Sequence, residues 1–179
     1  MKLIVIDMQK ALMDDELYNF VGLVENIVKL IAAARENGVE VVYVQHDAGE
    51  GTGFSVGDEA FEIADEVAPH AGEKAFVKTC SSSFTNKDFA AYLEEAKDDT
   101  LMIVGLQTNF CVDATVKSAF ERGYDVIIPE GTNSTFDNPY MNAKTTYEYY
   151  MNEVWPGLFA DCVSMDEAIE LIKEQRPGD

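Results

Sequence analysis

The sequence predicts an α/β domain built around a parallel β-sheet. Short apolar runs alternate with helical stretches along the whole chain, which is typical of such domains. The runs are apolar throughout, as expected for strands that are buried on both faces. The chain has 179 residues, of which 47% are hydrophobic. This length is enough for one domain with a sizeable core that needs neither disulfide nor metal to hold it.

The first half of the chain predicts three strands and one long helix. Lys2–Ile6 is a continuous apolar run and forms the first strand. Apolar residues three and four positions apart predict a helix over Val21–Asn37, and Gly38 is placed to end it. Four glycines and no helical period predict a loop from His46 to Gly57. The other two strands of this half are Val39–Val44 and Ala75–Val77.

The second half continues the alternation of helices and strands. The predicted strands are Leu101–Gly105, Asp125–Ile128 and Leu158–Val163, and the predicted helices are Asn86–Ala96, Asn109–Arg122, Pro139–Glu153 and Met165–Gln175. The first of these helices opens with a capping residue. We find no internal repeat, low-complexity tract or linker in the sequence. Residues 1–179 are therefore expected to form a single domain.

Charge and cysteine content bear on partners and location. Thirteen Lys and Arg against 33 Asp and Glu give a net charge of -20, which repels nucleic acid and anionic membranes. No apolar run approaches the ~20 residues that span a bilayer. The N-terminal apolar run is too short for a secretory signal. The three cysteines, Cys80, Cys111 and Cys162, form neither a disulfide framework nor a CxxC metal motif. A cytoplasmic location is expected.

Three reactive side chains are expected to share one crevice. Asp7 ends the first strand, Lys78 follows the third, and Cys111 begins the helix after the fourth. Ligands of parallel sheets bind beyond the carboxyl ends of the strands, where the strand order reverses. A helix N-terminus and a nearby ammonium both favour thiolate over thiol at Cys111. Asp7 is positioned to take the thiol proton and to return it to a leaving amine.

Further residues are candidates for the same crevice. The backbone N–H groups of Gln107 and Cys111 are candidates for an oxyanion hole. Phe20, Phe84 and Phe110 are candidates for an apolar wall that contacts substrate, although aromatic side chains of this kind are more often core. His46 ends a strand that faces the crevice, where it would contact substrate or hold the adjacent loop.

The segment Tyr140–Tyr150 carries four tyrosines, with methionines at Met141 and Met151. The spacing places this apolar area on one outer helix. Such a helix would cap the crevice or form a subunit interface, and the enrichment in Tyr and Met favours the interface.

Four motifs, in order along the chain, resemble those of the isochorismatase-like cysteine hydrolases. They are Leu3-Ile4-Val5-Ile6-Asp7-Met8-Gln9, Glu73 to Lys78 with Ser83-Phe84, Gly105-Leu106-Gln107-Thr108 with Cys111-Val112 and Thr115, and Gly123-Tyr124-Asp125-Val126. The likeness runs from Leu3 to about Ile172. It implies a doubly wound, mostly parallel sheet of about six strands with helices on both faces, a Rossmann-like three-layer sandwich. It also implies a catalytic triad of Asp7, Lys78 and Cys111, a cis peptide bond between Leu106 and Gln107, and a homodimer or homotetramer.

Departures from the family pattern narrow the expected activity. The nicotinamidase branch binds a metal through an Asp-x-His and further histidines, whereas this chain has Gln45-His46-Asp47 and only one other histidine, His70. We therefore expect no metal and no cofactor. True isochorismatases commonly lack the cysteine. Retention of Cys111 favours hydrolysis of a C–N bond in a small amide, ureido or carbamoyl compound through a thioester. The alternatives are an isochorismatase-type or nicotinamidase-type hydrolase, or a non-catalytic redox-sensing or binding protein of the same fold.

Overall fold

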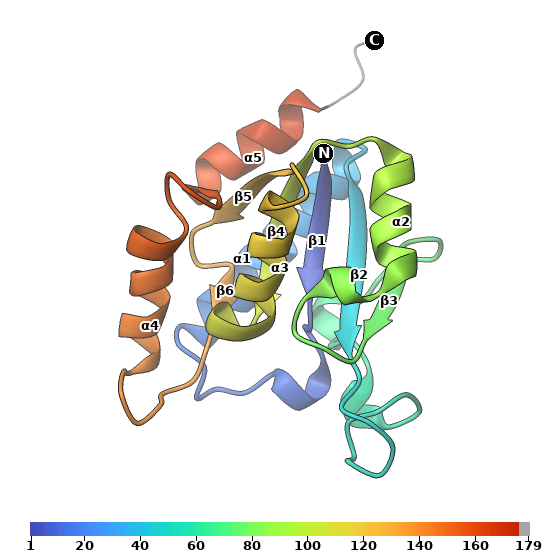
Figure 1. Cartoon of the computed structure of the whole chain (residues 1–179), viewed down its shortest axis with the longest axis vertical. Helices are drawn as coiled ribbons and strands as arrows, with labels where there is room; N and C mark the ends of the chain where they lie inside the picture. The colour runs from blue at the N-terminus through green and yellow to red at the C-terminus, as the bar shows by residue number, and fades with distance from the viewer. Residues whose placement is uncertain (176–179) are drawn as a thin grey trace.

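Seven strands form one parallel sheet in the computed structural model of the chain, which describes residues 1–175 (Figure 1). They are β1 (Lys2–Ile6), β2 (Glu40–His46), β3 (Lys74–Lys78), β4 (Thr100–Leu106), β5 (Asp125–Pro129), β6 (Asn133–Ser134) and β7 (Asp161–Val163). The order is β3-β2-β1-β4-β5-β7, with the two-residue β6 beside β4. The chain runs outward from β1 through β2 to β3 and then returns to β4, so the strand order reverses between β1 and β4.

Five α-helices accompany the sheet. They are α1 (Phe20–Glu36), α2 (Lys87–Ala96), α3 (Asp113–Phe120), α4 (Ala143–Tyr149) and α5 (Met165–Glu174). Two π-helical segments, Thr108–Val112 and Tyr150–Val154, join α3 at its start and α4 at its end. Short 3-10 turns cover Lys10–Leu12, Glu59–Phe61, Asp65–Val67 and Ser83–Thr85. Within residues 1–175, every helix falls short of the length and apolarity that a membrane-spanning segment needs.

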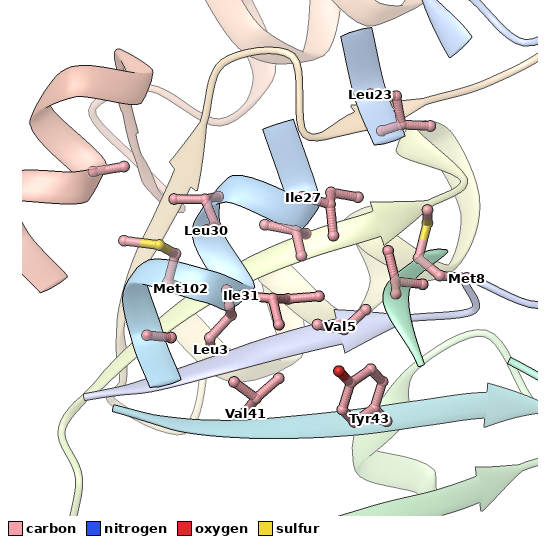
Figure 2. Packing of buried hydrophobic residues seen from close by; sticks show 14 of the residues in the cluster. Leu3, Val5, Met8, Leu23, Ile27, Leu30, Ile31, Val41, Tyr43 and Met102 are labelled. Atoms are coloured by element: carbon pink, nitrogen blue, oxygen red, sulfur yellow. The ribbon is translucent and has the colours of Figure 1, made fainter. Parts of the chain in front are cut away.

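The strands bury both faces, which makes the molecule three layers deep. Leu3 and Val5 point toward α1 and α5, while Ile4 and Ile6 point toward α2 and α3. Figure 2 shows the first of these layers, where Ile27, Leu30 and Ile31 of α1 pack over β1, β2 and β4. Burying one such side chain contributes about 1.5–3 kcal/mol. The apolar runs are therefore strands covered on both sides, and the doubly wound α/β fold expected from the sequence is confirmed.

Side-chain caps define where several helices begin. The Asn86 side chain accepts a hydrogen bond from the Phe89 N–H at the start of α2, as the sequence predicts. Asn142 and Ser164 cap α4 and α5 in the same way. After α1, Gly38 adopts a φ of 73°, the left-handed conformation that commonly ends a helix.

The largest departures from the predicted elements lie in the second half. The single helix predicted over Asn109–Arg122 is a π-helical segment followed by α3. The strand β6 was not predicted, because two residues carry no periodic signal. The strand expected over Leu158–Val163 is confirmed as β7 but is confined to Asp161–Val163.

The tyrosines of Tyr140–Tyr150 do not form one outer helical face, so that prediction is corrected. Because Asn142 caps α4, Tyr140 and Met141 lie in the preceding loop, and Tyr140 is 94% exposed. Tyr147 turns inward, where its hydroxyl accepts a hydrogen bond from the Gly131 N–H and its ring packs on Tyr18. Met151 is buried in the core. Helical spacing alone could not reveal that Tyr147 and Met151 are packed inside the chain.

Candidate active site

Asp7, Lys78 and Cys111 meet at the carboxyl edge of the sheet, beside the reversal between β1 and β4. Asp7 directly follows β1, Lys78 ends β3, and Cys111 lies in the π-helical segment after β4. The Lys78 Nζ donates to Asp7 Oδ2 at 2.7 Å and to Cys111 Sγ at 3.3 Å. The structure therefore brings together the three side chains that the sequence nominates.

The three groups differ in how far they reach solvent. Asp7 is 0% exposed and Lys78 is 1% exposed, whereas Cys111 is half-buried. The ion pair is thus sealed behind the sulfur. Asp7 Oδ1 is buried and has no hydrogen-bond partner within residues 1–175. A buried carboxylate oxygen without a hydrogen-bond donor lowers the stability of the fold. Its position beside the Cys111 thiol therefore suits it to exchange a proton with that thiol.

The backbone beneath the site is unusually tight. Asp7 has a φ of 52°, a left-handed conformation that non-glycine residues seldom adopt. Its N–H donates to the Val44 carbonyl at 2.8 Å. Gly105, at a φ of 121°, lies so close to Ile6 that a Cβ would collide with the Ile6 carbonyl. β1 and β4 therefore approach each other closely at the point where they present Asp7 and the nucleophile segment.

Burial is the main cause of the pKa shifts of Asp7 and Cys111. It raises the pKa of Asp7, and Lys78 opposes this rise. Burial likewise raises the pKa of Cys111 to about 12; the charge of Asp7 adds to this effect, and Lys78 offsets only part of it. Lys78 lowers the pKa of Cys111, as the sequence predicts, but desolvation of the sulfur and the charge of Asp7 outweigh this influence, so the net shift favours the thiol.

His46 completes the surroundings of the Lys78 ammonium. Its Nδ1 lies 3.4 Å from Lys78 Nζ, so the three ammonium protons face three acceptors. Burial and the nearby ammonium lower the pKa of His46, which fits a neutral imidazole that accepts through Nδ1. His46 thus contacts Lys78 and belongs to the site, a role that differs from the two considered from the sequence, contact with substrate or support of the adjacent loop.

Gln9 is a residue of the site that sequence reasoning missed. It is fully buried, and its side chain donates to the His46 and Phe61 carbonyls at 3.0 and 2.8 Å. Its Oε1 accepts from the His46 N–H at 2.7 Å. Gln9 therefore fixes the end of β2 on which His46 stands. Gln9 lies two residues after Asp7, in the first of the four motifs, and this position could have identified it from the sequence.

Asp7, His46 and Cys111 also offer ligand atoms within 4.8 Å of one another, a spacing that suits a metal ion. The Lys78 ammonium, however, lies within 3.4 Å of an atom of each. A metal would have to displace this buried cation or stand beside it. The site thus carries its own positive charge.

The turn after β4 carries Gln107, whose N–H is one of the two candidate oxyanion donors. The Leu106–Gln107 peptide bond is cis, as the family resemblance implies. Within the described chain, the Gln107 N–H donates to no protein group. The Thr135 hydroxyl, just beyond β6, lies 3.3 Å from Gln107 Oε1 and 2.7 Å from Asn109 Oδ1. Through β6 and Thr135, the sheet thus supports the segment that carries Cys111.

The aromatic candidates separate into one exposed and two packed residues. Phe110 is 56% exposed and lines an open groove that begins at Gln107. Phe20 begins α1 and packs against the core beneath it. Phe84 is buried against Phe89 and Tyr124, and Tyr124 lies before β5 at the opposite end of the sheet from Asp7. The structure therefore brings Phe110 near the site and places Phe84 in the core, because apolar burial against α2 holds that ring.

The site is a buried Asp–Lys pair behind a half-exposed cysteine, at the strand reversal of a doubly wound sheet, as the resemblance to cysteine hydrolases implies. Comparison with known proteins agrees with this assignment. The family model described as the isochorismatase domain matches residues 2–156. The chain belongs to the isochorismatase family, and its homologues include hydrolases.

Three similar proteins illustrate the range of the family. An uncharacterized isochorismatase family protein of Bacillus subtilis is 31% identical over 93% of each chain. A ureidoacrylate amidohydrolase of Rhizobium rhizogenes is 25% identical over 82% of this chain and 72% of its own. The crystal structure of N-carbamoylsarcosine amidase from Thermoplasma acidophilum superposes with a TM-score of 0.75 and 26% identity, covering 93% of this chain and 98% of that one.

Proposed function

We propose that the protein is a metal-independent amidohydrolase that cleaves a C–N bond of a small amide, ureido or carbamoyl compound through a thioester on Cys111. The observation that carries this proposal is the shared ammonium of Lys78, bonded to both Asp7 and Cys111, with Asp7 Oδ1 left free. Two of the similar proteins are named for amide or ureido hydrolysis, which supports the same bond type.

The first half-reaction transfers the acyl group to sulfur. Cys111 Sγ forms a bond to the substrate carbonyl carbon, while its proton passes to Asp7 Oδ1. The carbonyl π electrons move to oxygen, and the N–H groups of Gln107 and Cys111 donate to the resulting oxyanion. As the carbonyl re-forms, the C–N bond breaks and the leaving nitrogen takes the proton from Asp7.

The second half-reaction releases the acid. Water loses a proton to Asp7 as its oxygen bonds to the thioester carbon. The C–S bond then breaks, and the sulfur recovers the proton from Asp7. Asp7 therefore serves as base and acid in turn, a role that typically accelerates a step by about 10²–10⁴-fold. Lys78 donates to both Asp7 and Cys111 and stabilises whichever of the two is negative.

Intact-protein mass spectrometry tests the covalent step. The protein is incubated with a panel of amides, ureido and carbamoyl compounds, quenched in acid, and examined for an acyl adduct that peptide mapping places on Cys111. Cys111→Ala should lose both the adduct and turnover while keeping the fold.

Cys162→Ala is the matched control, because this thiol is also half-buried but lies in β7, whereas Cys111 lies in the π-helical segment after β4. It should keep both adduct and turnover. Undiminished hydrolysis by Cys111→Ala, or an adduct on another residue, would refute the mechanism.

A further inference from the structure

An open groove of about 520 Å³ adjoins the nucleophile segment. It begins at Gln107 and Phe110 and continues along the segment that leads from β6 to α4 (Figure 1). Its volume lies in the range of small-molecule sites. Because Gln107 carries a proposed oxyanion donor and Phe110 precedes Cys111, a substrate whose carbonyl lies at the sulfur can extend into this groove.

The groove surface is mostly apolar, although five of its ten lining residues are polar: Gln107, Asn109, Thr135, Asp137 and Asn138. Phe110, Phe136, Pro139, Tyr140 and Met141 line it, and the rings of Phe110 and Tyr140 are 56% and 94% exposed. Among the described residues that line it, Asp137 alone is charged. Asp137 is exposed, and its Oδ1 accepts a hydrogen bond from the Ala143 N–H at 2.7 Å. Aromatic faces and a carboxylate together favour a cation or a neutral apolar group.

The loops around the site add further negative charge to that of Asp137. Three segments follow strands at the carboxyl edge: residues 8–19, 47–58 and 135–142 (Figure 1). Together they carry seven carboxylates and one ammonium, that of Lys10. A cleft lined by one sign of charge concentrates ligands of the opposite sign.

The basic side chains near this edge already have acidic partners. Lys78 is paired with Asp7 inside the site, and Lys10 bonds Glu62 at 2.6 Å. Lys144, the second residue of α4, pairs with Glu148. A carboxylate on the substrate would therefore find no uncommitted cation among these residues.

We propose that this groove binds the substituent of the substrate amide and selects uncharged or cationic substituents over anionic ones. The inference rests on the proposed function, since it names the substrate class of the same site. It follows from an aromatic groove whose single charged lining residue is acidic, at an edge whose loops are acidic and whose cations are paired.

The rate of covalent modification of Cys111 tests this charge selection without a known substrate. Three methanethiosulfonates serve as probes: a small neutral methyl reagent, and a cationic ethyltrimethylammonium and an anionic ethylsulfonate reagent whose transferred groups are similar in size. Peptide mass spectrometry follows each cysteine separately, and every rate is divided by the rate of the same reagent with 2-mercaptoethanol. The normalised cationic rate at Cys111 should exceed the anionic rate by about 10-fold or more. The exposed Cys80 should show a smaller preference.

Substitutions at three positions locate the effect. Asp137→Lys should lower the cation preference at Cys111 several-fold, and Asp137→Asn should do so more weakly while keeping the acceptor for Ala143. Asp161→Lys makes the same charge change at the start of β7, away from the groove, and should leave the preference unchanged. Phe110→Ala should lower the cationic rate relative to the neutral one.

Equal or reversed rates for the cationic and anionic reagents at Cys111 would overturn the proposal, as would equal effects of Asp137→Lys and Asp161→Lys. The acyl adduct on Cys111 is measured separately. An adduct without charge selection would support the proposed amidohydrolase mechanism and contradict the proposed role of this groove. Charge selection without any adduct would support the groove while counting against the thioester.

Discussion

The proton of Cys111 has two acceptors within the site, its own sulfur and Asp7 Oδ1. Moving it between them leaves the net charge of the site unchanged, because one negative charge simply passes from carboxylate to sulfur. Lys78 contacts both groups and is closer to Asp7, at 2.7 Å against 3.3 Å for the sulfur. Because burial raises the pKa of the thiol to about 12, the proton rests on the sulfur until a substrate draws the thiol into bond formation.

This resting state predicts how Cys111 reacts with iodoacetamide as pH changes. Because burial raises the pKa of the thiol to about 12, the rate should climb about tenfold per pH unit from pH 7 to 10 without a plateau. Asp7→Asn removes a charge that raises this pKa, so the variant should be alkylated faster at pH 7 and yet lose turnover. A plateau below pH 8 in the parent protein would show a preformed thiolate and favour a redox-sensing role.

Gln9 gives a second prediction at the scale of the residue. Gln9→Leu keeps the size of the side chain but removes the partners of the His46 N–H and carbonyl. Each polar group left unpaired in the interior costs about 1–3 kcal/mol, so urea unfolding should show a loss of roughly 2–4 kcal/mol. Turnover should fall as well, because His46 and Lys78 lose their support.

Gln45→Leu is the matched control for this substitution. The half-buried Gln45 makes one bond, to the Phe61 carbonyl at 3.0 Å, which Gln9 also contacts. Its loss should cost less than about 1 kcal/mol and leave turnover near the parent value. Equal losses for the two variants would contradict the role given to Gln9.

At the scale of the element, the approach of β1 to β4 depends on Gly105. Gly105→Ala would place a methyl group against the Ile6 carbonyl and would add the strain of an alanine at positive φ. Overpacking costs about 1–3 kcal/mol and left-handed backbone about 1–2 kcal/mol, so unfolding should reveal a loss above roughly 3 kcal/mol. Turnover should vanish, since both Asp7 and Gln107 follow this contact directly.

Gly123→Ala separates the two contributions. Gly123 also has a positive φ, of 87°, but a Cβ there would meet nothing within 4 Å. Its loss should stay near the 1–2 kcal/mol of backbone strain, with turnover retained. If Gly105→Ala proved no more harmful than Gly123→Ala, the close approach of the two strands would not be what positions the site.

The elements that the sequence predicts correctly are those with a strong local signal. The β-strands Lys2–Ile6 and Thr100–Leu106 are long apolar runs, and Asn86 is a cap that hydrogen-bonds its own helix. The triad could be nominated because Asp7, Lys78 and Cys111 each follow a strand in a parallel sheet. β6, the burial of Tyr147 and the clamp made by Gln9 depend on contacts between distant segments, which no local pattern carries. The thiol pKa was misjudged for the same reason, since desolvation depends on how closely the fold surrounds the sulfur.

At the scale of the whole molecule, the net charge of -20 determines how the stability of the fold depends on salt. Most of the carboxylates are exposed and face each other across a small surface, so the compact state carries more repulsion than the unfolded chain. A few ion pairs act in the opposite sense, among them Lys2 with Asp98 and Arg35 with Glu73. Exposed pairs contribute little individually, whereas the repulsion is summed over the whole surface.

Salt should therefore stabilise this protein. Screening weakens the repulsion between exposed carboxylates more than it weakens the partly buried pairs, because the Debye length shortens from roughly 20 Å to a few ångström between 0.02 and 0.5 M NaCl. We expect the thermal midpoint to rise by about 2–4 °C, which corresponds to about 1 kcal/mol for a chain of this length. Glu94→Gln with Glu95→Gln removes two exposed charges from α2, so this variant should melt higher at low salt and gain less from added NaCl. A midpoint that fell as NaCl was added would mean that the ion pairs, and not the repulsion, dominate the electrostatics of the fold.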